Sequence, residues 1–109
     1  MPGAKIIVLY PTPTDINTFE RAYVDDHVPM VTPESFPGLT KFVASKVLAT
    51  PDGSAPRFHR IAELHFPSLS ALQAAAAAVS AQKVVAHAMS ISTGGPLMVL
   101  IADEQTTAF

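Results

Sequence analysis

Cysteine is missing from this chain of 109 residues, and its absence excludes several kinds of chemistry. Without a thiol, the protein has no disulfide, no thiolate metal site and no cysteine nucleophile. Charge is also scarce, because only 15% of the residues are charged, the net charge is -2 and no basic run occurs. Nucleic-acid binding needs a positive surface, so we expect no nucleic-acid partner.

Long hydrophobic runs are absent as well. No apolar run approaches the roughly 18 residues that a membrane-spanning helix needs, so we expect no membrane partner. The chain start, residues 1–5, leads straight into a short apolar segment that is too short for the core of a signal peptide. These features predict a cytoplasmic protein.

Apolar residues are abundant for so small a chain. They make up 49% of the sequence, and a chain of this length has room for one core and little more. A small monomer exposes too much surface to hide that many apolar side chains. We therefore expect burial against a second copy, in a homodimer.

The hydrophobic pattern predicts four strands and two helical regions. The expected strands are residues 5–10, 40–49, 57–66 and 97–102. The expected helices are residues 15–27, 68–79 and 81–89, with Ser68 and Ser80 as N-caps. With right-handed crossovers, this order predicts an α+β, ferredoxin-like split βαβ domain with a four-stranded antiparallel sheet and both helices on one face. Two such sheets packed through their bare faces would form a barrel-like dimer.

One stripe of the first predicted helix stands out as a candidate site. Phe19, Tyr23 and His27 are spaced four residues apart and therefore share one helix face. Pro29 is expected to end the helix, because a proline pushes the residue before it out of the helical region. An unperturbed pKa of about 6.5 would let His27 move a proton at neutral pH. The alternative is a helix-end histidine that bonds the last carbonyl groups.

The topology sorts the four histidines by the end of the sheet at which they lie. His27 ends the first helix and His65 ends the third strand, which places both at the same end. His59 and His87 fall at the other end. We therefore expect only His27 and His65 to share a pocket with Tyr23.

Other polar residues have more than one interpretation. Glu63 and His65 share one face of a strand, and they either contact a ligand or form a cross-strand pair on the dimer face. Met30 fits a soft apolar pocket wall or a core position. The acidic residues and histidines match no recognised metal-ligand spacing, so we expect no metal site. His87 as a haem ligand is the less favoured alternative.

Several short motifs together resemble the EthD family, which is named for a protein of bacterial ethyl tert-butyl ether degradation. The sharpest motif is Phe19-x3-Tyr23-x3-His27-Val28-Pro29. The others are Leu9-Tyr10-Pro11, Pro37-Gly38-Leu39, Arg60-Ile61-Ala62-Glu63-Leu64 and Thr93-Gly94-Gly95. They follow one another along nearly the whole chain.

The resemblance implies that residues 1–109 form a single EthD-like domain of the dimeric α/β-barrel superfamily. That superfamily includes cofactor-free monooxygenases, isomerases, dehydratases and haem-degrading enzymes, and fold does not fix function. We therefore carry two hypotheses. The first is a cofactor-free oxidoreductase- or isomerase-type enzyme on a small apolar substrate. The second is a non-catalytic accessory protein that binds an apolar ligand in a degradation pathway. The predicted catalytic residues are His27 and Tyr23, and the predicted substrate-binding residues are Phe19, Met30, His65 and Glu63.

Overall fold

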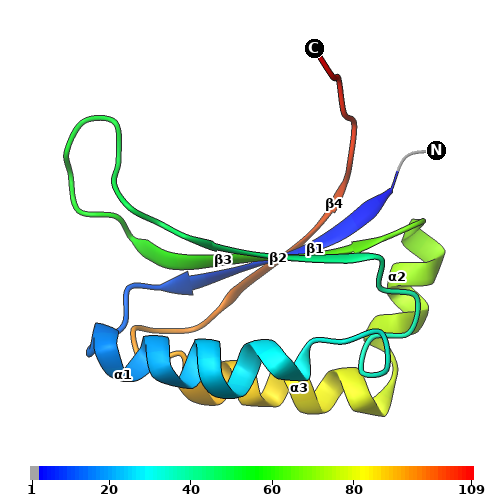
Figure 1. Ribbon diagram of the computed structural model, residues 1–109, viewed down its shortest axis with the longest axis horizontal. Helices are drawn as coiled ribbons and strands as arrows, with labels where there is room; N and C mark the ends of the chain where they lie inside the picture. The colour runs from blue at the N-terminus through cyan, green and yellow to red at the C-terminus, as the bar shows by residue number, and fades with distance from the viewer. Residues whose placement is uncertain (1–2) are drawn as a thin grey trace.

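The computed structural model describes residues 3–109, and its elements follow the predicted order (Figure 1). Met1 and Pro2, the first residues of the start inspected for a signal peptide, lie outside the described residues. The strands are β1 (Ala4–Pro11), β2 (Lys41–Lys46), β3 (Phe58–Phe66) and β4 (Met98–Asp103). The helical segments are α1 (Ile16–Arg21), η1 (Ala22–His27), η2 (Val28–Met30), α2 (Leu69–Ala76) and α3 (Val79–Ile91).

The sheet has the strand order β2-β3-β1-β4, and every neighbouring pair is antiparallel. Figure 1 shows the helices of the described residues on one side of this sheet, and no helix of residues 3–109 covers the other side. The predicted ferredoxin-like α+β fold is therefore confirmed.

Alternation along β1 assigns the two faces of the sheet. Ile6 and Tyr10 are buried beneath the helices, whereas Lys5 and Ile7 point to the bare face and are only half-buried. The register between β1 and β3 shifts after Tyr10 and skips His59. This irregularity lets His59 turn toward the helices, where it is buried, instead of following alternation to the bare face.

The first helix changes its winding along its length. It begins at the N-cap Asp15 and becomes π-helical in η1, where the backbone N–H of Val28 bonds the carbonyl oxygen of Tyr23, five residues earlier. Val28 itself stays helical, and Pro29 enters a 3₁₀ turn that ends only at Val31. The expectation that Pro29 pushes Val28 out of the helical region is thus wrong, although η1 itself ends at the predicted residue, His27. A proline is tolerated in the first turn of a helical segment, because its missing N–H has no partner to lose there.

The second helical region confirms one predicted cap and corrects another. The Ser68 hydroxyl accepts a hydrogen bond from the backbone N–H three residues later, at 3.1 Å. Ser80 is not a cap, because α3 begins at Val79 and the Ser80 hydroxyl instead donates to the carbonyl oxygen of Ser35. Leu72 is buried beneath the sheet, whereas Leu69 and Val79 are exposed.

The two helices of this region meet at a sharp bend of 76°. No single helix within residues 3–109 is long and apolar enough to cross a membrane. Only α2 and α3 taken together, bent as they are, reach that length and composition.

Candidate functional site

A cavity of about 180 Å³ lies between the sheet and the helices. Each strand contributes helix-facing side chains to its wall: Val8 from β1, Phe42 from β2, Leu64 from β3 and Val99 from β4. Helix α3 closes the opposite side, in part with Val84. The wall is apolar because strand residues of this face alternate with those of the bare face, and the helix-facing strand residues that line the cavity are apolar apart from Tyr10.

The cavity has the size of a small ring-shaped molecule and opens to solvent along one edge. An apolar cavity of about 150 Å³ is known to hold benzene, so this one has room for a slightly larger molecule. Val85, Val99 and Ile101 line it and are also exposed, which places its mouth between α3 and the edge strand β4.

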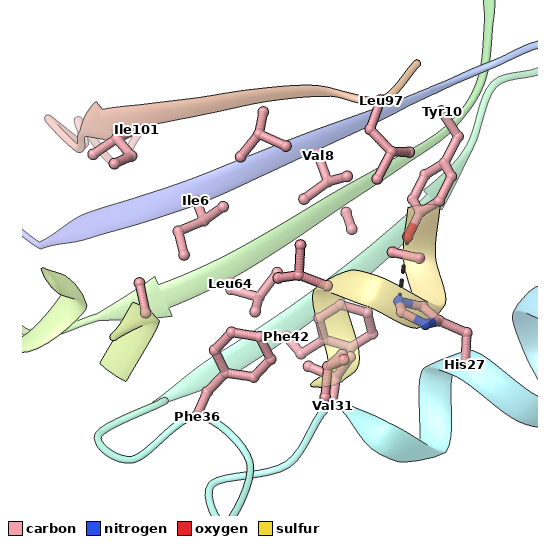
Figure 2. Close-up of a pocket in the computed structure, with 16 residues that line it drawn as sticks. Ile6, Val8, Tyr10, His27, Val31, Phe36, Phe42, Leu64, Leu97 and Ile101 are labelled. Carbon is pink, nitrogen blue, oxygen red and sulfur yellow. Dashed lines mark hydrogen bonds between the residues drawn. The ribbon is translucent and has the colours of Figure 1, made fainter. Parts of the chain in front are cut away.

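His27 forms the polar end of this cavity. Its side chain is buried, with 4% of the residue exposed, and it lines the wall together with Tyr10. A hydrogen bond of 3.2 Å joins Nε2 of His27 to the Tyr10 hydroxyl, and one of 2.9 Å joins its Nδ1 to Nδ1 of His87. Figure 2 shows the Tyr10 hydroxyl pointing to the His27 ring, with Ile6 and Ile101 toward the other end. A ligand in the cavity would therefore meet polar atoms at one end only.

Burial makes His27 a neutral ring at physiological pH. It lowers the pKa of His27 from 6.5 to about 4, and the neighbouring charge of His87 adds to the effect. The expected pKa near 6.5 is therefore wrong, and so is the alternative of a helix-end histidine bonded to the last carbonyl groups, because its two ring nitrogens contact Tyr10 and His87. The helix continues for another turn, so His27 lies within it and beneath the sheet. Burial also raises the pKa of Tyr10, which keeps its hydroxyl protonated.

Tyr10 and His87 are the site residues that the sequence analysis missed. Sorting the histidines by end failed for two reasons. The segment η1, which carries His27, packs against α3, which carries His87, and the Tyr10 side chain reaches the His27 ring from β1. Two local sequence signals could have identified these residues. Tyr10 occupies an even position of β1 like the buried Ile6, and His87 follows Val84 by three residues on the buried side of α3.

Tyr23 and Phe19 lie behind His27, not on the cavity wall. The Tyr23 ring stacks on His27 at 5.8 Å and on Phe19 at 5.5 Å. Its hydroxyl is buried and has no hydrogen-bond partner among residues 3–109, and burial raises its pKa to about 12. Met30 is partly buried against the core and is likewise not one of the wall residues. The three predicted residues thus surround His27 or the core, and their roles toward a ligand stay predictions.

The aromatic stack is held from the other side by an ion pair. Glu20 accepts two hydrogen bonds from Arg60, at 2.7 and 2.9 Å, and lies 3.1 Å from Nε2 of His59. Arg60 in turn lies 4.9 Å from the centre of the Tyr23 ring. The paired guanidinium keeps the pKa of the Glu20 carboxyl below its usual value.

Glu63 and His65 lie on the bare face of the sheet, which separates them from His27. Lys5 donates to Glu63 at 3.0 Å, and His65 lies 3.2 Å from Glu63 and 3.7 Å from Glu104. The predicted pocket shared by His27 and His65 is therefore wrong, because odd positions of β3 point away from the helices. The alternative, a cross-strand polar group on the face predicted for dimerisation, matches this arrangement.

Within residues 3–109, no three histidine, aspartate or glutamate side chains gather as ligands around one point. The two facing nitrogens of His27 and His87 are engaged with each other. The Tyr10 hydroxyl and the His27 ring offer hydrogen-bonding and proton-transfer chemistry.

Comparison with known proteins supports the resemblance found in the motifs. No protein-family model and no curated protein sequence matches the chain. Among solved structures, an EthD family protein from Bacillus halodurans C-125 is 25% identical with a TM-score of 0.84, over 94% of this chain and 99% of that one. An EthD-like protein from Ralstonia eutropha JMP134 is 20% identical with a TM-score of 0.71, over 94% and 91%. The resemblance to the EthD family is therefore confirmed.

More distant structures share the fold alone. One from Jannaschia sp. CCS1, described as a dimeric ferredoxin-like protein of unknown function, is 18% identical with a TM-score of 0.63, over 97% of this chain and all of that one. The hydroxynitrile lyase of Passiflora edulis is 13% identical with a TM-score of 0.70, over 98% and 96%. The fold thus occurs both in dimers and in an enzyme.

Proposed function

We propose that the protein is a cofactor-free enzyme that moves a proton on a small, mostly apolar substrate, in an oxidation, isomerisation or elimination. The observation that carries this proposal is the single polar end of an otherwise apolar cavity. An apolar wall binds without fixing orientation, so the substrate's one polar group would be drawn to Tyr10 and His27.

The two polar residues would have distinct roles in this reaction. His27 is neutral at pH 7 and has a nitrogen facing Tyr10, so it can receive a proton through the Tyr10 hydroxyl. The high pKa of Tyr10 keeps it a hydrogen-bond donor that can orient a substrate oxygen. Tyr23 and Phe19 would act indirectly, by stacking against the His27 ring and fixing its position.

A homodimer belongs to the same proposal. On the bare face of the sheet, Ile7 lies opposite Leu100 and Leu9 lies opposite Met98 in the β1–β4 register. These apolar side chains leave a patch that a second sheet would cover. The dimeric ferredoxin-like structure from Jannaschia supports this arrangement. Cytoplasmic localisation and a role in a catabolic pathway stay predictions.

A second function is favoured by the weak basicity of His27. A base with a pKa of about 4 holds a proton poorly at pH 7, which suits a binding protein that only recognises an apolar ligand. In that case the Tyr10 and His27 pair would provide orientation without chemistry.

The test separates binding from turnover. A panel of small phenols and unsaturated lactones would be screened by ligand-observed NMR, and each bound compound would be followed for conversion by mass spectrometry. Ala88 is buried in the cavity wall, so Ala88→Leu should abolish binding, whereas Ala86→Leu on the exposed side of the same helix should not. His27→Gln should keep binding but lower turnover by about 10²–10⁴-fold.

Three outcomes decide between the two functions. Conversion that His27→Gln abolishes supports the enzyme. Binding that Ala88→Leu removes, with no conversion of any bound compound, favours the binding protein. Binding that Ala88→Leu leaves intact contradicts the cavity as the site of either function.

A further inference from the structure

The contact between His27 and His87 joins two chemically equivalent atoms. Nδ1 of one ring lies 2.9 Å from Nδ1 of the other, and the rings are nearly parallel at 12°. In a hydrogen bond between two neutral imidazoles, one nitrogen must carry a proton and the other must not. When both rings are neutral, they must therefore be opposite tautomers.

The hydrogen bond between His27 and Tyr10 carries this dependence on the tautomer into the cavity. If Tyr10 donates to Nε2 of His27, then His27 carries its proton on Nδ1 and donates to His87, whose proton sits on Nε2. If His27 instead donates from Nε2, every hydrogen bond in the chain reverses. The three side chains thus have two consistent states, which differ in the direction of the hydrogen bonds.

His87 gives this chain of hydrogen bonds an end in solvent. The residue is half-buried on α3, in contrast to the buried His27. Its ring is bonded to His27 through Nδ1, which leaves Nε2 as the nitrogen that can exchange a proton with solvent. His87 is also not among the residues of the cavity wall. Its contacts therefore connect the inner end of the cavity to the outside.

We propose that Tyr10, His27 and His87 form a proton relay between the cavity and solvent, with His87 as the outer member. This inference rests on the proposed function, because a relay needs a substrate that gives or takes a proton in the cavity. It assigns to His87 a role in proton transfer, although His87 does not line the cavity and would not contact a bound ligand.

The transfer balances without leaving a charge on any of the three residues. A bound substrate gives its proton to the Tyr10 oxygen and keeps the electron pair of the broken bond, while the Tyr10 proton moves to Nε2 of His27. The proton on Nδ1 of His27 moves to Nδ1 of His87, and the proton on Nε2 of His87 leaves to water. The reverse sequence returns a proton to the product and restores the first state.

The relay resolves the conflict between a proton-transfer role and the burial of His27. A buried ring disfavours the charged imidazolium, so His27 is poorly suited to store a proton. It can still pass one on, because each ring loses a proton at one nitrogen as it gains one at the other.

Nitrogen NMR of histidine-labelled protein tests the arrangement without any substrate. The ¹⁵N shifts report which ring nitrogen carries the proton, and the relay requires His27 and His87 to be opposite tautomers at pH 7, or averaged between the two states. Both rings protonated on the same nitrogen, or both fully charged, would overturn the proposal.

Proton exchange tests the transfer itself. Saturation transfer from water measures how fast the ring N–H of His27 exchanges, and His87→Gln and His87→Phe should each slow it at least tenfold. Glutamine can keep a hydrogen bond to His27 and phenylalanine can keep the stack, but neither passes a proton. Lys83→Gln, at an exposed position of the same helix, is the matched control and should exchange like the wild type. Equal rates in all four proteins would overturn the relay.

Failure of the relay can be told apart from failure of the proposed function. If the ligand panel yields no substrate while exchange depends on His87, the enzyme proposal fails and the relay stands. If a substrate is converted at the wild-type rate by His87→Gln, the relay fails and the enzyme proposal stands.

Discussion

Lowering the pH should destabilise the folded protein, because His27 is neutral when buried and takes up a proton on unfolding. Replacing His27 alone should remove this contribution. The ring is buried and neutral in the folded state, with a pKa lowered from 6.5 to about 4, while in the unfolded chain it takes up a proton near its ordinary pKa. Between these two values the unfolded state binds the extra proton. Stability from this group is therefore complete above about pH 6.5 and declines as the pH falls toward 4.

The size of the effect follows from the two pKa values. One unit of pKa difference corresponds to about 1.4 kcal/mol, so full protonation would cost the folded state about 3 kcal/mol. Over the narrower range from pH 7 to pH 5, the same two values give a loss of about 2 kcal/mol in the free energy of unfolding. With a urea m-value of about 1–3 kcal/mol/M, that loss moves the urea midpoint by about 1 M.

Urea unfolding of the wild type and of His27→Gln at pH 7, 6 and 5 measures this contribution. Glutamine can still bond the Tyr10 hydroxyl and His87 but does not titrate, so the carboxylates and the histidines that do not contact His27 contribute alike to both proteins. The difference in unfolding free energy between the two should change by about 2 kcal/mol across the series. Parallel pH dependences, or an NMR titration that places the pKa of His27 above 6, would refute the buried neutral ring.

Three further predictions concern the neighbouring structure. Tyr10→Phe should lower the free energy of unfolding by about 1 kcal/mol in urea denaturation, because a buried imidazole nitrogen loses its hydroxyl partner; an unchanged midpoint would mean that the hydroxyl bond contributes nothing. Glu20→Gln should lower it by about 2 kcal/mol, since the Arg60 guanidinium loses a charged, two-point acceptor; thermal unfolding of both proteins checks this, and equal midpoints would contradict it. Leu100→Glu on the bare face should convert the proposed dimer to a monomer in light scattering coupled to size exclusion, whereas Val24→Glu, equally exposed on the helix side, should stay dimeric; a dimer in both would place the interface elsewhere.

The architecture was predictable because it depends on signals that are local in sequence. Each strand is a short apolar or alternating run bounded by proline or glycine, and the Ser68 cap marks a helix start. Element boundaries were less predictable where tertiary contacts override local preference. Ser80 has the chemistry of a cap, but its hydroxyl is used to hold the Ser35 loop.

The candidate site was predictable only in part, because a pocket depends on how side chains meet across elements. The spacing of Tyr23 and His27 correctly placed them on one helix face, and their rings do stack. The partners of His27 come from β1 and α3, and no spacing within one segment encodes that meeting. The pKa of His27 was not predictable either. Burial lowers it, and burial depends on tertiary packing and not on the neighbours of His27 in the sequence.

The π-helical segment η1 has a consequence for how such a site is gained or lost. A π turn holds one residue more than an α turn, so deletion of a single exposed residue, such as Val24 or Asp25, would restore regular winding. Each residue of an α-helix turns the chain by about 100°, so a deletion in the regular α1 segment would rotate α1 against the segment that carries His27 by that angle. A deletion within η1 instead removes the extra residue of a wide turn, which leaves the helical segments on either side facing as they do here. The π turn is therefore a place in this helix where a relative can lose one residue and still keep the imidazole in the cavity. An alignment gap within residues 22–27 would be compatible with the same site.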